Sequence, residues 1–249
     1  MEASGRPWRG SRPRALLAQI LMSKEERAEA VELLHQAMEE YLAAAEEFLR
    51  LADIVAAWED RAVHTLVATD AATTLAMADR WDAAGTAYER AVASHAEAPN
   101  PSLIVHMMCE FARLTMASQG ADGVDTALDH LTQADAIRGA VPEGTEDFVP
   151  WYESGTVHYR RAVVLAEAER YPEALTEAEA AIAANDEGGE HGEGSRAEAV
   201  RIAALIEGKG LGRFKEAIAR LTTAAARCRK ADLPEAARLD ALRQDYLTR

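Results

Sequence analysis

The segment RWDAAGTAYERAV, at residues 80–92, has two close copies further along the chain. They read RYPEALTEAEAAI at 170–182 and RFKEAIARLTTAA at 213–225. Each copy begins with an arginine and an aromatic ring, places an alanine three positions after the ring, and places another alanine seven positions later. The rings and alanines, copy by copy, are Trp81, Ala84 and Ala91; Tyr171, Ala174 and Ala181; and Phe214, Ala217 and Ala224.

A fourth stretch, at 123–136, keeps the same alanine spacing with Ala127 and Ala134 but has no ring at its start. Residues three, four and seven apart lie on one face of an α-helix. Small side chains on that face let a paired helix approach closely, while a bulky residue between them, such as Tyr88, fills the space beside them. The spacing therefore predicts helices that pack in pairs, and it indicates packing rather than chemistry.

The composition agrees with an all-helical chain. Alanine, the residue with the highest helix propensity, makes up about a fifth of the sequence, and runs of strand-favouring residues are nearly absent. Only 6% of the residues are aromatic, which suits thin layers of closely spaced helices better than one thick core. The first alanines of the four stretches are 43, 47 and 43 positions apart, a period typical of a helical solenoid.

The helical pattern divides the chain into a series of hairpins. Residues 1–13, rich in arginine, glycine, proline and serine, are expected to be a disordered basic tail. The acidic, glycine-rich stretch at 185–194 is expected to be a disordered connector. A single repeat domain is predicted over 14–249, with hairpins at 14–50, 53–97, 102–137, 151–184 and 195–229 and a terminal helix at 232–247.

These features resemble the tetratricopeptide repeat (TPR) family. The family pattern is a hairpin of 34 residues whose second helix carries the alanine spacing, and Ala84/Tyr88/Ala91 and Tyr171/Ala174/Ala181 match that half. The tryptophan, leucine and glycine expected in the first helix are missing, and the period here is longer, as in divergent members. The resemblance implies a right-handed superhelix of four to five hairpins that holds a protein or peptide segment in its concave groove.

The resemblance also places the groove on the first helices of the hairpins. One group of the family grips C-terminal carboxylates there with lysine and asparagine, but the matching positions here hold neither residue. The groove residues that the resemblance implies are Thr69, Thr73, Met77, His106, Arg113, Tyr159, Val163 and Arg201.

Motifs for catalysis and metal binding give weak signals. Glu32 and His35 form half of a di-iron motif that lacks its second half. Asp60 and His64 lie one turn apart, as an ordinary surface pair does. His106 and Cys109 share a helix face, but nothing marks the oxyanion site that a thiolate nucleophile needs. We therefore expect no catalytic residue, no metal and no cofactor, and an enzyme is the least favoured class.

Charge and cysteine content bear on the partner. The net charge of −15 disfavours nucleic acid and an anionic membrane and favours a basic partner. Two distant cysteines and no apolar run long enough to span a bilayer favour the cytoplasm.

The favoured function is a non-catalytic scaffold that binds a protein segment or another copy of the chain. The alternative is the sensor domain of a larger bacterial transcriptional regulator or signalling ATPase.

Overall fold

A computed structural model describes residues 36, 39, 40, 42–47, 50, 51, 54, 61–97 and 99–248. The predicted tail (1–13), the pair Glu32 and His35, and Asp60 lie outside these residues, as does most of the predicted hairpin at 14–50. The chain divides into two units, Met1–Ile104 and Val105–Arg249, and each is described by itself.

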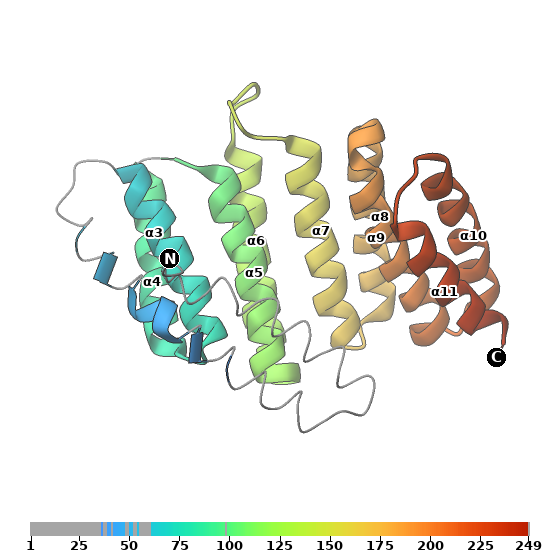
Figure 1. Cartoon of the computed structure of the whole chain (residues 1–249), viewed down its shortest axis with the longest axis horizontal. Helices are drawn as coiled ribbons and strands as arrows, with labels where there is room; N and C mark the ends of the chain where they lie inside the picture. The colour runs from blue at the N-terminus through green and yellow to red at the C-terminus, as the bar shows by residue number, and fades with distance from the viewer. Residues whose placement is uncertain are drawn as a thin grey trace, which may run out of the picture. The chain divides into compact units, whose positions relative to one another are not determined.

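The described residues contain α-helices and short 3₁₀ and π segments, and no strand (Figure 1). The all-α prediction is therefore confirmed for this part of the chain. α3 (Arg61–Met77) and α4 (Trp81–Glu97) lie in the first unit, where residues 42–47 are helical as well, and α5 (Pro101–Gln119) begins there and continues into the second unit. The second unit continues with α6 (Val124–Ala140), α7 (Pro150–Glu167), α8 (Tyr171–Glu187), α9 (Glu193–Leu205), α10 (Phe214–Lys230) and α11 (Glu235–Leu247).

The repeated alanines lie on four helices of equal length. α4, α6, α8 and α10 each have 17 residues, and α4, α8 and α10 begin at the ring that opens each sequence copy. The eight alanines of the repeat are all at most 2% exposed. The residue four positions after the first alanine is also buried in each helix, namely Tyr88, Leu131, Ala178 and Leu221. The prediction that this spacing serves helix packing is therefore confirmed.

The same turn joins the helices in two of the hairpins. The amide of Arg80 donates to the carbonyl of Leu75 at 2.9 Å, and that of Arg170 donates to Leu165 at 2.8 Å. These bonds span five residues, as in a Schellman motif, and the residue before each arginine has a positive φ, as that motif requires. In the third copy Gly212 takes this conformation, with φ of 67°, after a π segment at Ile206–Gly210.

The predicted disordered connector at 185–194 is wrong. α8 continues to Glu187, a 3₁₀ turn covers Gly189–Gly192, and α9 begins at Glu193. Arg227 of α10 fixes this segment, because its Nε donates to Glu193 at 2.6 Å and its Nη2 donates to Asp186 at 2.9 Å. Ion pairs to a distant helix hold a stretch whose composition alone is typical of disorder.

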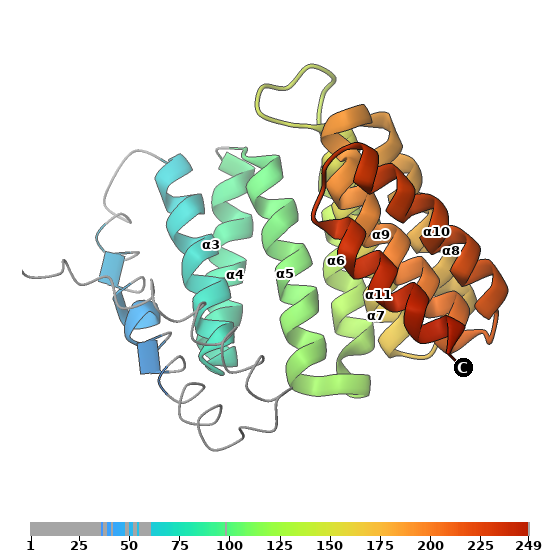
Figure 2. The ribbon, with the colours of Figure 1, turned by 45° about the vertical axis from the view of Figure 1, so that its right-hand side comes forward.

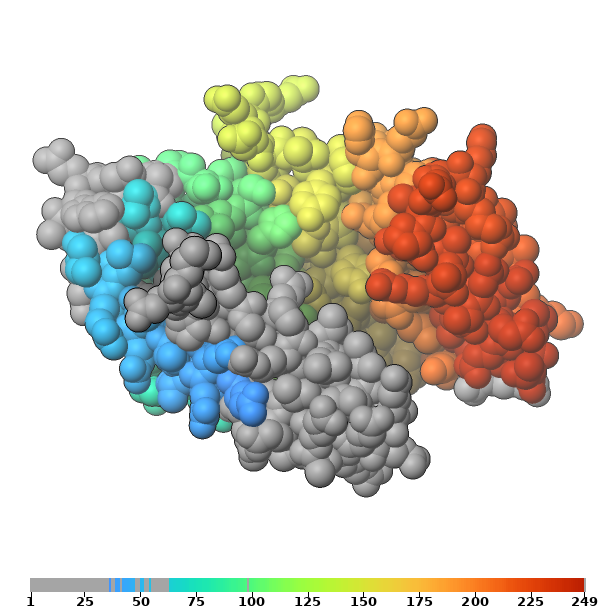
Figure 3. All heavy atoms as spheres, in the orientation of Figure 1, coloured from blue at the N-terminus to red at the C-terminus, as the bar shows by residue number. Residues whose placement is uncertain are grey.

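Helices of the second unit pack on their neighbours in chain order. α7 packs against α8, α8 against α9, α9 against α10, and α10 against α11, as Figures 1 and 2 show. The loop at 141–149 projects from the ends of α6 and α7 (Figure 3). First helices also meet directly, since α7 contacts α9 and Arg160 of α7 lies 3.6 Å from Glu110 of α5.

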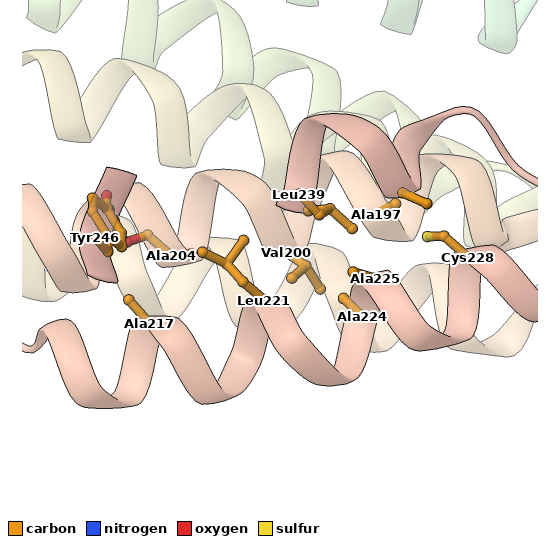
Figure 4. Close-up of a cluster of buried hydrophobic side chains, with 11 residues drawn as sticks. Ala197, Val200, Ala204, Ala217, Leu221, Ala224, Ala225, Cys228, Leu239 and Tyr246 are labelled. Carbon is orange, nitrogen blue, oxygen red and sulfur yellow. Dashed lines mark hydrogen bonds between the residues drawn. The ribbon is translucent and has the colours of Figure 1, made fainter. Parts of the chain in front are cut away.

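The core at the C-terminal end shows how alanines and larger residues alternate (Figure 4). Leu221 of α10 is fully buried among Ala217, Ala224 and residues of α9 and α11. Tyr246 of α11 closes the cluster, with its hydroxyl donating to the carbonyl of Ala204 at 3.3 Å. A Cβ at Gly208 would lie 2.6 Å from the Tyr246 ring, so glycine is needed there for close packing.

A matched pair of substitutions on α4 tests the alanine packing. Ala84 is fully buried and Ala93 is exposed on the same helix. We expect Ala84→Leu to lower the free energy of unfolding by about 1–3 kcal/mol because the larger side chain overpacks the hairpin, and Ala93→Leu to change it by less than about 0.5 kcal/mol. Chemical denaturation of the two variants measures this difference. Equal losses would contradict the packing role.

Candidate functional site

The predicted groove residues lie in both units. In the first unit Thr69 is 5% exposed and its Oγ1 donates to the carbonyl of Thr65 at 2.8 Å, while Thr73 donates to Thr69 at 3.1 Å. Met77 is half-buried. The buried Thr69 is bonded to its own helix and is therefore not available to a partner.

The other five predicted residues lie on the first helices of the second unit. They are half-exposed side chains on α5, α7 and α9: His106, Arg113, Tyr159, Val163 and Arg201. α7 contacts both of the other two helices. We call this surface, together with the residues that line it, the α5–α7–α9 face.

Two pockets lie between α7 and α9. The first, of about 220 Å³, is lined by Tyr152, Gly155, Thr156 and Tyr159 of α7, Asn185 of α8, and Ser195 and Glu198 of α9; we call it the Asn185 pocket. The second, of about 290 Å³, is mostly apolar, with Val163 and Ala166 of α7 and Ile202 and Leu205 of α9 in its wall; we call it the Ile202 pocket. Tyr159 and Val163, both predicted from the sequence, therefore each line a pocket.

Asn185 is the residue of this site that the sequence analysis missed, because it was assigned to a disordered connector. It is 2% exposed, and its Nδ2 donates to the carbonyl of Ala181 at 2.8 Å. Its Oδ1 has no hydrogen-bond partner among the described residues. A signal was present, since Asn185 continues the buried alanine stripe of α8 by one turn.

Gly155 lets α7 lie against this amide. A Cβ at that position would be 2.8 Å from Nδ2 and 2.9 Å from Oδ1 of Asn185, which is closer than real Cβ contacts. The missing side chain at Gly155 therefore allows α7 to pack closely on Asn185, and both residues line the pocket.

Arginines flank two carboxylates of this face, those of Glu198 and Glu110. Glu198 accepts hydrogen bonds from Nε of Arg201 at 2.8 Å and from Nη1 of Arg238 at 3.1 Å. Burial opposes the charge on Arg201, but the bonds to Glu198 and the contact with Tyr159 outweigh it and raise the pKa of the guanidinium. On α5, Glu110 likewise lies between Arg113 and Arg160. Each carboxylate is thus flanked by two guanidinium groups.

His106 and Cys109 do not form a nucleophilic pair. Nε2 of His106 lies 3.0 Å from the buried carboxylate of Glu153, and its ring stacks on Tyr152 with centroids 5.5 Å apart. Cys109 is 2% exposed, and burial raises the pKa of its thiol to about 12. Cys109 is therefore a protonated thiol in the core at neutral pH.

A further pocket of about 370 Å³ lies among α6, α7 and α8. Its charged side chains are paired with one another and with neighbours: Arg161 donates to Asp135 at 2.5 Å, and Nε of Arg170 donates to Glu173 at 2.8 Å. This pocket lies outside the α5–α7–α9 face, and its ion pairs join neighbouring helices.

In the part of the chain that the structure describes, no three His, Cys, Asp or Glu residues lie together as metal ligands do. Nor is any described helix both long and apolar enough to cross a membrane.

None of the models of known protein families matches the chain, and no curated protein matches it significantly.

Proposed function

We propose that the chain is a non-catalytic scaffold that binds an extended segment of a partner protein on the α5–α7–α9 face. We further propose that its hairpins form a right-handed superhelix of the TPR type. The helical hairpins and their buried alanine seams support the second proposal. The half-exposed side chains and pockets of the first helices support the first.

The observation that carries the proposed function is the alignment of the two pockets between α7 and α9. Gly155 of the Asn185 pocket and Val163 of the Ile202 pocket are eight residues apart on one helix, which is about 12 Å along its axis. An extended chain covers that distance with about four residues. A segment with a polar group at one pocket and an apolar side chain at the other would fill both.

A charge placed in the Ile202 pocket tests this proposal. A library of random 12-residue peptides is selected on the full chain, and the affinity of the enriched peptides is measured by fluorescence anisotropy. We expect Val163→Arg to weaken binding at least about tenfold, because the longer, charged side chain would fill the pocket and leave no room for an apolar side chain of the peptide.

The matched control is Ala219→Arg, at an exposed position of α10, which should leave the affinity within about twofold. Both variants should keep the helical circular dichroism of the original chain. If the library yields no binding peptide, or if Val163→Arg binds the peptides as tightly as the original chain, the proposed function is wrong.

A further inference from the structure

We propose that the Asn185 pocket selects the segment: Oδ1 of Asn185 accepts a hydrogen bond from a main-chain N–H, and Arg201 binds a single carboxylate of the same segment. This inference rests on the proposed function and names the chemistry of the partner at the same face.

The first support is the unused hydrogen-bonding capacity of Asn185. A buried polar atom without a partner destabilises a fold, so buried polar atoms in proteins are nearly always bonded. Asn185 is 2% exposed, its Oδ1 has no partner among the described residues, and its side chain forms part of a pocket wall. A bound donor would satisfy this oxygen.

The second support is the shape of the site. The Asn185 pocket and the Ile202 pocket are lined by successive stretches of α7, so an occupant of both is elongated and carries both polar and apolar groups. An extended peptide supplies a main-chain N–H at every second residue on one side. Tyr152 and Tyr159 lie about two turns apart on α7 and both line the pocket.

The third support is the local charge. Arg201 and Arg238 share the single carboxylate of Glu198, so a lysine of the partner would meet an excess of positive charge, whereas a carboxylate would meet two guanidinium groups. Arginine binds carboxylates well because its donors match their two oxygens.

The net charge of −15 limits how acidic the segment can be. Charges beyond about 8–10 Å are screened at physiological salt, while contacts in the pocket are not. One carboxylate at Arg201 is therefore favoured, and a run of acidic residues would be repelled by the rest of the surface. A partner that is basic overall is compatible with this single local carboxylate.

The test uses the peptides selected on the full chain. We expect them to share one aspartate or glutamate about four residues from an apolar residue. Replacing Asp by Asn or Glu by Gln in the peptide should weaken binding to the original chain about tenfold, yet have little effect on binding to Arg201→Gln. Replacing the apolar residue of the peptide should weaken binding to the original chain and to Arg201→Gln by the same factor.

Asn185→Leu tests the hydrogen bond. The main-chain nitrogens of the peptide are methylated one at a time. Methylation at one position should weaken binding to the original chain about tenfold and leave binding to Asn185→Leu almost unchanged. The same variant should keep a melting temperature close to that of the original chain, because leucine has the same branched shape and leaves no unbonded oxygen. A purely structural asparagine would instead give a lower melting temperature with unchanged binding, and that result would overturn the inference.

The two proposals fail differently. If Val163→Arg abolishes binding but neither Asn185→Leu nor the loss of the peptide carboxylate has an effect, this inference is wrong and the proposed function stands. If the selected peptides are basic and lack a carboxylate, this inference is also wrong. If Val163→Arg has no effect, the proposed function falls and this inference falls with it.

Discussion

Replacing Gly192 by alanine should lower the free energy of unfolding by about 3 kcal/mol or more, toward the upper end of the cost of overpacking. A Cβ at Gly192 would lie 2.0 Å from the carbonyl oxygen of Asn185 and 3.0 Å from its carbonyl carbon. Both atoms belong to the backbone, so no side chain can rotate away to relieve the clash. The connection between α8 and α9 would have to shift instead.

Gly194, two residues further on, provides the control. Nothing lies within 4 Å of a Cβ at that position, and the residue is inside α9. Gly194→Ala should therefore raise stability by about 0.4–1 kcal/mol, because alanine loses less backbone entropy on folding into a helix. Urea denaturation of both variants gives the comparison. If Gly192→Ala were as stable as Gly194→Ala, the ordered turn at 189–192 would be contradicted.

Removing Arg220 has the second largest expected effect. The Glu207 side chain is only 7% exposed, and it accepts two bonds from Arg220, from Nε at 2.9 Å and from Nη2 at 2.6 Å. Arg220→Ala leaves this carboxylate buried without its cation, which costs about 3–5 kcal/mol for fully buried pairs. Because Arg220 is itself 24% exposed, we expect a loss of about 2–3 kcal/mol in the free energy of unfolding.

Two further variants check the cause of that loss. Adding Glu207→Gln to Arg220→Ala should restore part of the stability, because an amide is less costly to bury than a carboxylate. Arg170→Ala removes the partner of Glu173 from an exposed pair and should produce no measurable change. A loss of similar size in Arg170→Ala, or no recovery in the double variant, would show that the buried carboxylate is not the cause.

The helices could be predicted because their signals are local. Ala174 and Ala181 are in one helix, and their spacing alone places them on the same face. The turn before α10 is a local signal too, since Gly212 has the positive φ that glycine adopts most readily. Such features depend on residues within about one or two helical turns in the sequence.

Parts of the structure that depend on contacts between residues far apart in the sequence could not be predicted. The segment at 185–194 resembles a disordered linker in composition, and Arg227, more than thirty residues away, holds it in place. Asn185 becomes part of a pocket only because Gly155 of another helix lies against it. The exposure of Tyr159 and Val163 followed from the resemblance to a repeat family, whereas the burial of Thr69 depends on how its own hairpin packs.

A crystal structure of the full chain bound to one selected peptide is the most direct test of the central claim. We expect an extended peptide between α7 and α9, with an apolar side chain in the Ile202 pocket and a main-chain nitrogen about 3 Å from Oδ1 of Asn185. A peptide bound across α8 and α10, or anywhere else with the α5–α7–α9 face empty, would contradict it.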